Sequence, residues 1–356
     1  MKNSKTSSPD FAFHSTCTNF ALSYKAGNKM DFRTTIHTTD NQGIMHHSDS
    51  YMMLGSCFSD NMGNKLRAAM VDVDVNPFGT IYNPYSIATS LERLMAGESE
   101  RGIDLFEAGG VWNSYHFHSR YSLPDKQATL EKMNARIAAA HQRLATCNTL
   151  IITLGTAVVY RLKSTGEVVA NCHKVPQHHF TRTMASVDEM TATLGATLER
   201  LHAFNPGLRV IFTLSPIRHI ADGLQVNSLS KASLRVTIDN LNRAYKDFTG
   251  YFPAYEIMLD DLRDYRFYAP DMVHPSEVAI EYMWQVFQAT YFDDASTQAI
   301  ARCERVTKRL NHRPMSSNRE VVERFNADTR SVVRNLAKEY PYIKRIKEIQ
   351  NILSVQ

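Results

Sequence analysis

A serine near the start of the chain and an aspartate–histidine pair near its end have the chemistry of a serine hydrolase. Ser56 follows Gly55 near the start, and Asp271 stands three residues before His274 near the end. A histidine can take the proton of a serine hydroxyl, while a carboxylate fixes the tautomer of the histidine and stabilises its protonated form. Neither the serine nor the Asp-x-x-His pair alone is strong evidence for a hydrolase, because serine is a common helix cap and Asp-x-x-His also occurs in plain surface turns.

Apolar runs that end at glycine indicate where these residues lie in the fold. Residues 51–54 form such a run, which stops at Gly55, and apolar residues at helical spacing follow from residue 59 to residue 70. Ser56 is therefore expected at a strand-to-helix turn, where the helix N-terminus directs amide groups toward it. The Ser56 amide would then help to bind an oxyanion.

Predicted strands and helices alternate about five times, which favours a parallel sheet covered by helices on both faces. Further strands are expected at residues 71–75, 149–154, 208–214 and 253–258, a hairpin at 158–170, and a helix that starts at the capping box Ser186–Glu189. Ligand sites in such sheets lie beyond the carboxyl ends of the strands. We expect a disordered leader at residues 1–29, the main domain at 30–294 and a helical extension at 295–356.

Composition excludes several classes of protein. The net charge of +4 is scattered along the chain, so a nucleic-acid partner is not expected. The five cysteines are odd in number and contain no Cys-x-x-Cys, which favours a reduced, cytoplasmic protein. No apolar run approaches the length of a membrane span, so no membrane partner is expected, and the oligomeric state is left open.

Ordered sequence blocks resemble the GSCFA family, a branch of the SGNH/GDSL-type hydrolases. The resemblance covers residues 31–290, and its blocks are Gly55–Ser59, Asn76–Thr80, Thr153–Thr156, Asn171–Lys174, Ser215–His219, Asp264–Tyr268 and Asp271–Pro275. It implies an α/β, three-layer α/β/α flavodoxin-like fold with about five parallel strands. It also implies a serine esterase without a cofactor, with Ser56, His274 and Asp271 as the catalytic triad.

The oxyanion hole departs from the SGNH pattern. Gly79 falls near the second oxyanion block of those enzymes, although a plain turn glycine is an equal alternative. The third strand of SGNH enzymes usually ends in Gly-x-Asn-Asp, whereas here Ala157 stands in place of the asparagine and has no donor. Thr156, Asn76, Asn171 or a histidine are the candidates to replace it.

Histidines and polar residues in the loops are expected to line the substrate pocket. These are Trp112, His116, His118, Asn171, His173, Arg218 and His219. Zinc binding is the alternative for the histidines, but no compact ligand spacing supports it, and we predict no metal. Cys57 at the helix start is an alternative nucleophile, because such a cysteine can have a lowered pKa. The resemblance favours Ser56, and Cys57 is expected to pack inward.

Taken together, the sequence predicts an acyl hydrolase acting on a small-molecule ester. By analogy with the wider group, the substrate would be a carbohydrate-type acyl or acetyl ester. An acyltransferase that uses the same triad is the first alternative. A non-catalytic ligand-binding domain is the second, supported by the missing asparagine at the end of the third strand.

Overall fold

The computed structural model describes residues 33–38, 41–312 and 318–355. The chain divides into two units, Met1–Thr34 and Thr35–Gln356. All the helices and strands given below belong to the second unit. The leader predicted at residues 1–29 lies outside the described residues.

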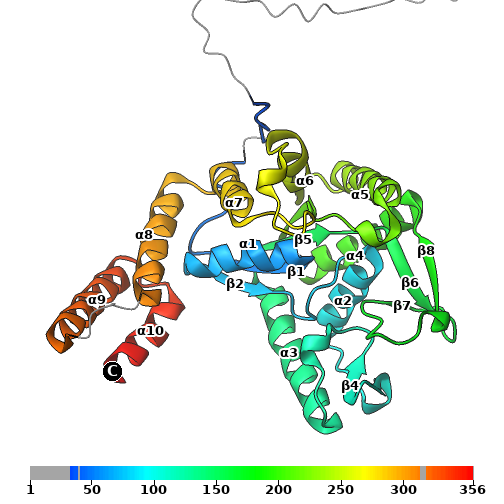
Figure 1. The fold of residues 1–356 in the computed structure, drawn as a ribbon, viewed down its shortest axis with the longest axis horizontal. Coiled ribbons are helices and arrows are strands. Elements are labelled where there is room, and N and C mark those ends of the chain that lie inside the picture. Colours follow the sequence, from blue (N-terminus) through cyan, green and yellow to red (C-terminus); the bar gives the residue numbers. More distant parts are fainter. Residues whose placement is uncertain (1–32, 39–40, 313–317, 356) are drawn as a thin grey trace, which may run out of the picture. The chain divides into compact units, whose positions relative to one another are not determined.

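A five-stranded parallel sheet forms the framework of the second unit (Figure 1). Its strand order is β10-β9-β5-β1-β2, with bounds β1 Ser50–Gly55, β2 Asp72–Val75, β5 Thr149–Leu154, β9 Arg209–Leu214 and β10 Thr249–Phe252. The register pairs Gly55 with Thr153 and Thr153 with Thr213, so β1, β5 and β9 end side by side. The predicted α/β fold class is confirmed.

Both faces of the sheet are buried, as expected for parallel strands. Successive side chains of a strand point to opposite faces, so β1 places Met52 and Leu54 in one core and Tyr51 and Met53 in the other. The first core is closed by α2 (Pro84–Ala96), α3 (Lys126–Thr146), α4 (Val187–Phe204) and α5 (Leu224–Ala244). The second is closed by α1 (Cys57–Ala68) and α7 (Glu277–Tyr291). The result is the predicted three-layer arrangement.

Helix starts follow the capping signals of the sequence. The Ser186 side chain accepts a hydrogen bond from the Glu189 amide, and the Glu189 side chain accepts one from the Ser186 amide, which confirms the capping box. The strand expected at residues 253–258 is wrong. The strand is β10, which ends before Pro253, since proline has no N–H to continue the ladder. The chain turns instead into α6 (Ala254–Glu256) and the π-helical turn η5 (Ile257–Asp261).

Two small antiparallel sheets extend from the main sheet. One is the hairpin of β3 (Leu105–Ala108) and β4 (Val111–Ser114). The other contains the predicted hairpin, β6 (Val158–Leu162) with β7 (Val168–Val169), and a third strand that was not predicted, β8 (Phe180–Met184). Short 3-10 turns complete these segments: η1 Gly102–Asp104, η2 Ser119–Tyr121, η3 Gln177–His179, η4 Ile220–Asp222 and η6 Tyr265–Phe267.

Three helices follow the sheet: α8 (Asp294–Asn311), α9 (Arg319–Glu339) and α10 (Lys344–Val355), drawn in orange to red in Figure 1. They share a small apolar core that includes Cys303, Val333 and Ile346. The Tyr342 hydroxyl lies 3.0 Å from His47 Nδ1, which ties these helices to the start of β1. Among the described helices, none has the length and apolar character needed to cross a membrane.

Candidate functional site

Ser56 lies at the carboxyl end of β1, where it caps α1. Its Oγ accepts a hydrogen bond from the Phe58 amide at 3.2 Å and donates one to Ser215 Oγ at 3.0 Å. Ser215 follows β9, so this bond spans the end of β5. Ser56 is only 3% exposed, and within the described part of the chain no hydrogen bond joins it to His274. In this conformation the hydroxyl faces the protein interior.

Cys57 is the first residue of α1, and its side chain is exposed. The expectation that it packs inward is therefore wrong, because Ser56 takes the inward position as the helix cap. Partial desolvation by the surrounding atoms, and then the Asp60 carboxylate, raise the pKa of the Cys57 thiol. The thiol therefore rests protonated and would need a base in order to react.

Asp271 and His274, which the sequence predicts to act as carboxylate and base, lie in direct contact. Asp271 Oδ2 lies 2.6 Å from His274 Nδ1, and Oδ1 accepts the amides of Val273 and His274, both at 2.9 Å. Met272 adopts a φ of 57°, which turns the backbone tightly enough for these contacts. The backbone hydrogen bond from His274, followed by that from Val273, holds the pKa of Asp271 at about 2. Asp271 is thus an ionised acceptor at neutral pH, and His274 Nε2 is left to take a proton.

Most of the predicted oxyanion donors are engaged within the fold. The Gly79 amide donates to the Asn76 carbonyl at 2.8 Å. The Asn76 side chain is used at both ends, since its Oδ1 accepts the Gly55 amide and its Nδ2 donates to Asp60. Thr156 Oγ1 accepts the Val158 amide and shares a hydrogen bond with Ser230, which lies in α5. These groups hold the loops at the sheet edge.

His219 is placed differently, against the end of β5. Its ring lies 5.2 Å from that of Tyr82, and its Nε2 would be 3.3 Å from a Cβ added to Gly155. This Nε2 is buried and has no hydrogen-bond partner. Burial lowers the pKa of His219 to about 4, and the charges of Lys231 and, more weakly, of His274 act in the same direction. The imidazole is neutral at physiological pH.

Lys231 is a buried residue of the site that sequence reasoning missed. It is 1% exposed, and its Nζ donates to the Ser215 carbonyl at 2.7 Å. Burial lowers its pKa to about 7. A signal was available in the sequence, because Lys231 shares helical spacing with Leu234 and Ile238 and so falls on the buried face of α5.

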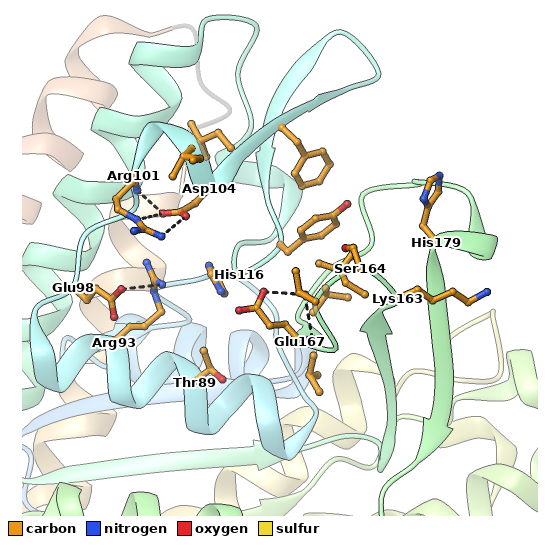
Figure 2. A pocket seen from close by; sticks show the side chains of 18 of the residues that line it. Thr89, Arg93, Glu98, Arg101, Asp104, His116, Lys163, Ser164, Glu167 and His179 are labelled. Carbon is orange, nitrogen blue, oxygen red and sulfur yellow. Dashed lines mark hydrogen bonds and ion pairs between the residues drawn. The ribbon is translucent and has the colours of Figure 1, made fainter.

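A large cavity, shown in Figure 2, has none of the predicted catalytic residues Ser56, Asp271 and His274 in its lining. It has a volume of about 1080 Å³ and lies between α2, the start of the β3–β4 hairpin and the β6–β7 sheet. Arg93, Arg101, Lys163 and Glu167 contribute charged groups of both signs to its lining. Of the residues predicted to bind substrate, His116 alone is among the residues that line it.

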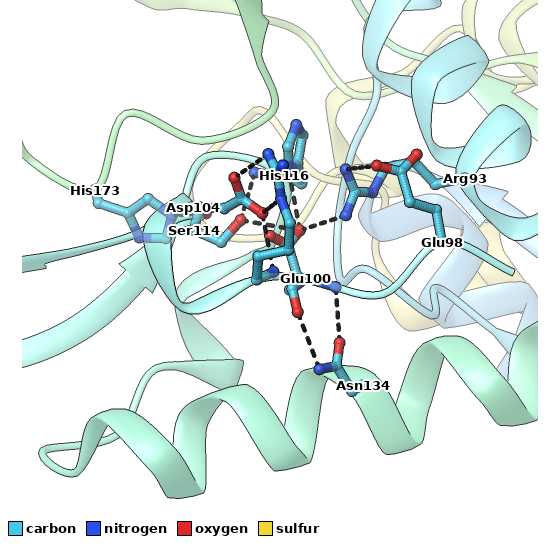
Figure 3. A network of polar contacts seen from close by, with 9 residues as sticks. Arg93, Glu98, Glu100, Asp104, Ser114, His116, Asn134 and His173 are labelled. Carbon is cyan, nitrogen blue, oxygen red and sulfur yellow. Dashed lines mark hydrogen bonds and ion pairs between the residues drawn. The ribbon is translucent and has the colours of Figure 1, made fainter.

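A buried carboxylate holds His116 in this wall (Figure 3). The Glu100 side chain is completely buried, and its Oε1 accepts a hydrogen bond from Ser114 Oγ at 3.2 Å and lies 2.9 Å from His116 Nδ1. Arg93 Nη2 lies 3.2 Å from the same oxygen. The Asn134 side chain bonds the backbone N–H and carbonyl of Glu100. Sequence reasoning missed Glu100, whose partners come from separate segments.

The other residues predicted to bind substrate are distributed over several segments. His118 abuts Gly79, while His173 Nε2 lies 2.7 Å from the Ser114 carbonyl and the His173 amide donates to Asn171. Arg218 lies over the Tyr268 ring, and Lys126 lies over that of Trp112. Among the described residues, no group of three or more His, Cys, Asp or Glu side chains could hold a metal ion.

Comparisons with known proteins identify a family. The model of the GSCFA family matches residues 50–287, from the start of β1 into α7. A solved structure similar to this chain is an acetyl xylan esterase from the rumen bacterium Butyrivibrio proteoclasticus, with a TM-score of 0.37 and 10% identity. The alignment covers 69% of this chain and 64% of that esterase. No curated protein matches the chain.

Proposed function

The chain belongs to the GSCFA family, and we propose that it hydrolyses esters with a nucleophile from the turn between β1 and α1. The observation that carries this proposal is the 2.6 Å contact between Asp271 and His274, together with the two backbone amides that fix the carboxylate. A partly exposed imidazole oriented by an ionised carboxylate can act as a general base. The two amide bonds make an Asx turn, and the contact with Nδ1 orients the imidazole in addition.

In the proposed reaction His274 Nε2 takes the proton of the nucleophile as the latter attacks the ester carbonyl. The tetrahedral intermediate collapses when the bond to the alcohol breaks, and His274 returns the proton to that alcohol. Water, activated by the same histidine, then releases the acid. Asp271 orients His274 throughout and stabilises its protonated form.

Ser56 is the proposed nucleophile on the sequence pattern. To react, its hydroxyl has to leave Ser215 and rotate toward His274. Cys57 is the second candidate, favoured by one observation: it is exposed at the start of α1, whereas Ser56 is 3% exposed. A protonated thiol beside a general base follows the same sequence of steps and passes through a thioester.

Single substitutions measured with p-nitrophenyl acetate test the proposal. His274→Ala is expected to abolish turnover above background, and either Ser56→Ala or Cys57→Ala is expected to do the same. Cys172→Ala is the matched control, because Cys172 is a free, partly buried cysteine outside the turn. Full turnover by His274→Ala would refute the proposed base. Full turnover by both turn variants would refute a nucleophile in this turn.

By analogy with the wider SGNH group, we propose that these catalytic residues act on a carbohydrate-type acyl or acetyl ester. The same residues would serve an acyltransferase if a sugar hydroxyl replaced water as the acceptor. Product analysis with an acetylated oligosaccharide separates these functions, because hydrolysis releases acetate and transfer moves the acetyl group to an added sugar. A non-catalytic binding domain would do neither.

A further inference from the structure

An ester hydrolase needs hydrogen-bond donors at the point where the oxyanion forms. The Gly79 amide, the Asn76 amide group and the Thr156 hydroxyl are all bonded within the fold. Ala157 has no polar side chain to offer, and its amide donates to Ser230. The side chain that would complete the oxyanion hole therefore has to come from another segment.

His219 brings an unused polar atom to this edge. Its Nε2 is buried without a hydrogen-bond partner, next to Gly155 at the end of β5. A buried polar atom without a partner costs free energy, so its presence calls for an explanation. A ligand atom that accepts a hydrogen bond from Nε2–H would supply the missing partner.

The surroundings of His219 connect it to both halves of the proposed machinery. Its ring packs on Tyr82, and the pKa of Tyr82 is raised by burial and then by the neighbouring Cys57 thiol. The charge of His274 also acts on His219, in the direction that lowers the pKa of His219. Gly155 directly follows β5, and Thr153 of β5 pairs with Gly55, so the His219 ring lies at the same end of the sheet as the turn that carries the proposed nucleophile.

We infer that the Nε2–H group of His219 binds the carbonyl oxygen of the substrate and stabilises the oxyanion, in the role that an asparagine amide has in SGNH enzymes. This inference rests on the proposed ester hydrolysis. The ring keeps its proton throughout, so His219 donates a hydrogen bond and transfers nothing. Its packing against Tyr82, and the His219 amide bond to Asn227 Oδ1 at 2.9 Å, hold the ring in place before the substrate binds.

Kinetics of His219→Leu and His219→Gln with p-nitrophenyl acetate test the assignment. Loss of one oxyanion donor lowers kcat by about 10²–10³-fold, so this is the expected effect of His219→Leu, with KM changed much less. His219→Gln keeps an N–H donor and is expected to recover part of the loss. His202→Leu, an exposed histidine of α4, is the control and should keep wild-type kinetics. A kcat of His219→Leu equal to that of wild type would overturn the inference.

A second measurement does not depend on turnover or on the folding of variants. Nitrogen-15 NMR of the wild-type protein at neutral pH reports which ring nitrogen of His219 carries the proton. The inference requires the proton on Nε2, and a proton on Nδ1 alone would overturn it. A wild-type protein without ester turnover would instead refute the proposed hydrolysis, while the NMR result would still decide whether His219 is a donor.

Discussion

Replacing Lys231 with methionine is expected to stabilise the protein at pH 7. Burial lowers the pKa of this lysine from 10.5 to about 7. At about 1.4 kcal/mol per pH unit, its burial costs about 4–5 kcal/mol at neutral pH. Methionine fills a similar volume without a charge, but it leaves the Ser215 carbonyl without its donor, at a cost of about 1–3 kcal/mol. The expected net gain in the free energy of unfolding is about 1–4 kcal/mol.

The dependence of this gain on pH is the sharper part of the prediction. A lysine with a lowered folded-state pKa contributes stability that is fully present above pH 10.5 and is lost as the pH falls toward 7. Between pH 7 and pH 10.5, the free energy of unfolding of wild type should therefore rise by about 1.4 kcal/mol per pH unit relative to that of Lys231→Met. Urea unfolding of both proteins at pH 7, 8, 9 and 10 measures it. Lys246→Met, at an exposed lysine, is the control. A stability difference that stays constant with pH would refute the reasoning.

Three further substitutions have expected outcomes. Asp271→Asn should lower kcat/KM for p-nitrophenyl acetate by about 10⁴-fold at pH 7, with the melting temperature nearly unchanged because asparagine can still accept the backbone amides of the turn. Glu100→Gln should reduce the free energy of unfolding by about 3–5 kcal/mol, because the Glu100 carboxylate is fully buried beside Arg93. Its control is Glu98→Gln, at an exposed partner of Arg93, which should change the free energy of unfolding by less than about 1 kcal/mol. Gly79→Ala should lower the melting temperature more than Gly109→Ala does, because a Cβ at Gly79 would lie 2.2 Å from His118 Cβ while a Cβ at Gly109 would have nothing within 4 Å. Equal effects of Glu100→Gln and Glu98→Gln, or of Gly79→Ala and Gly109→Ala, would contradict the packing described.

The sheet could be predicted because its signals are local. β1, β5 and β9 read as apolar runs and β2 as an alternating segment, and Gly55 and Gly155 mark where β1 and β5 end. The last strand was predicted too late in the sequence, because Pro253 and the apolar residues after it look like a strand. The strand itself, β10, is formed by the residues before Pro253. Pairing with β9 decides that boundary, and pairing is not visible in a short segment.

In the candidate site, too, contacts within one short segment could be predicted, whereas contacts between distant segments could not. The Asp271–His274 contact could be predicted because both residues lie in one turn. The partners of Ser56 and Lys231 could not, since they depend on the register of β1, β5 and β9 and on how α5 packs on the sheet. The exposure of Cys57 could not be predicted either. Whether the first or the second residue after Gly55 turns outward depends on the backbone of a tight turn, where Gly55 adopts a φ of 149°.

The most direct test of the proposed function is to trap the acyl-enzyme and locate it. The protein would be quenched in acid during turnover of p-nitrophenyl acetate and its peptides examined by mass spectrometry. We predict an acetyl group on the peptide that contains Ser56 and Cys57, present in wild type and absent in His274→Ala. Neutral hydroxylamine would remove a thioester from Cys57 and leave an oxygen ester on Ser56. Ester turnover without an acyl group in this turn, or equal labelling in His274→Ala, would contradict the account.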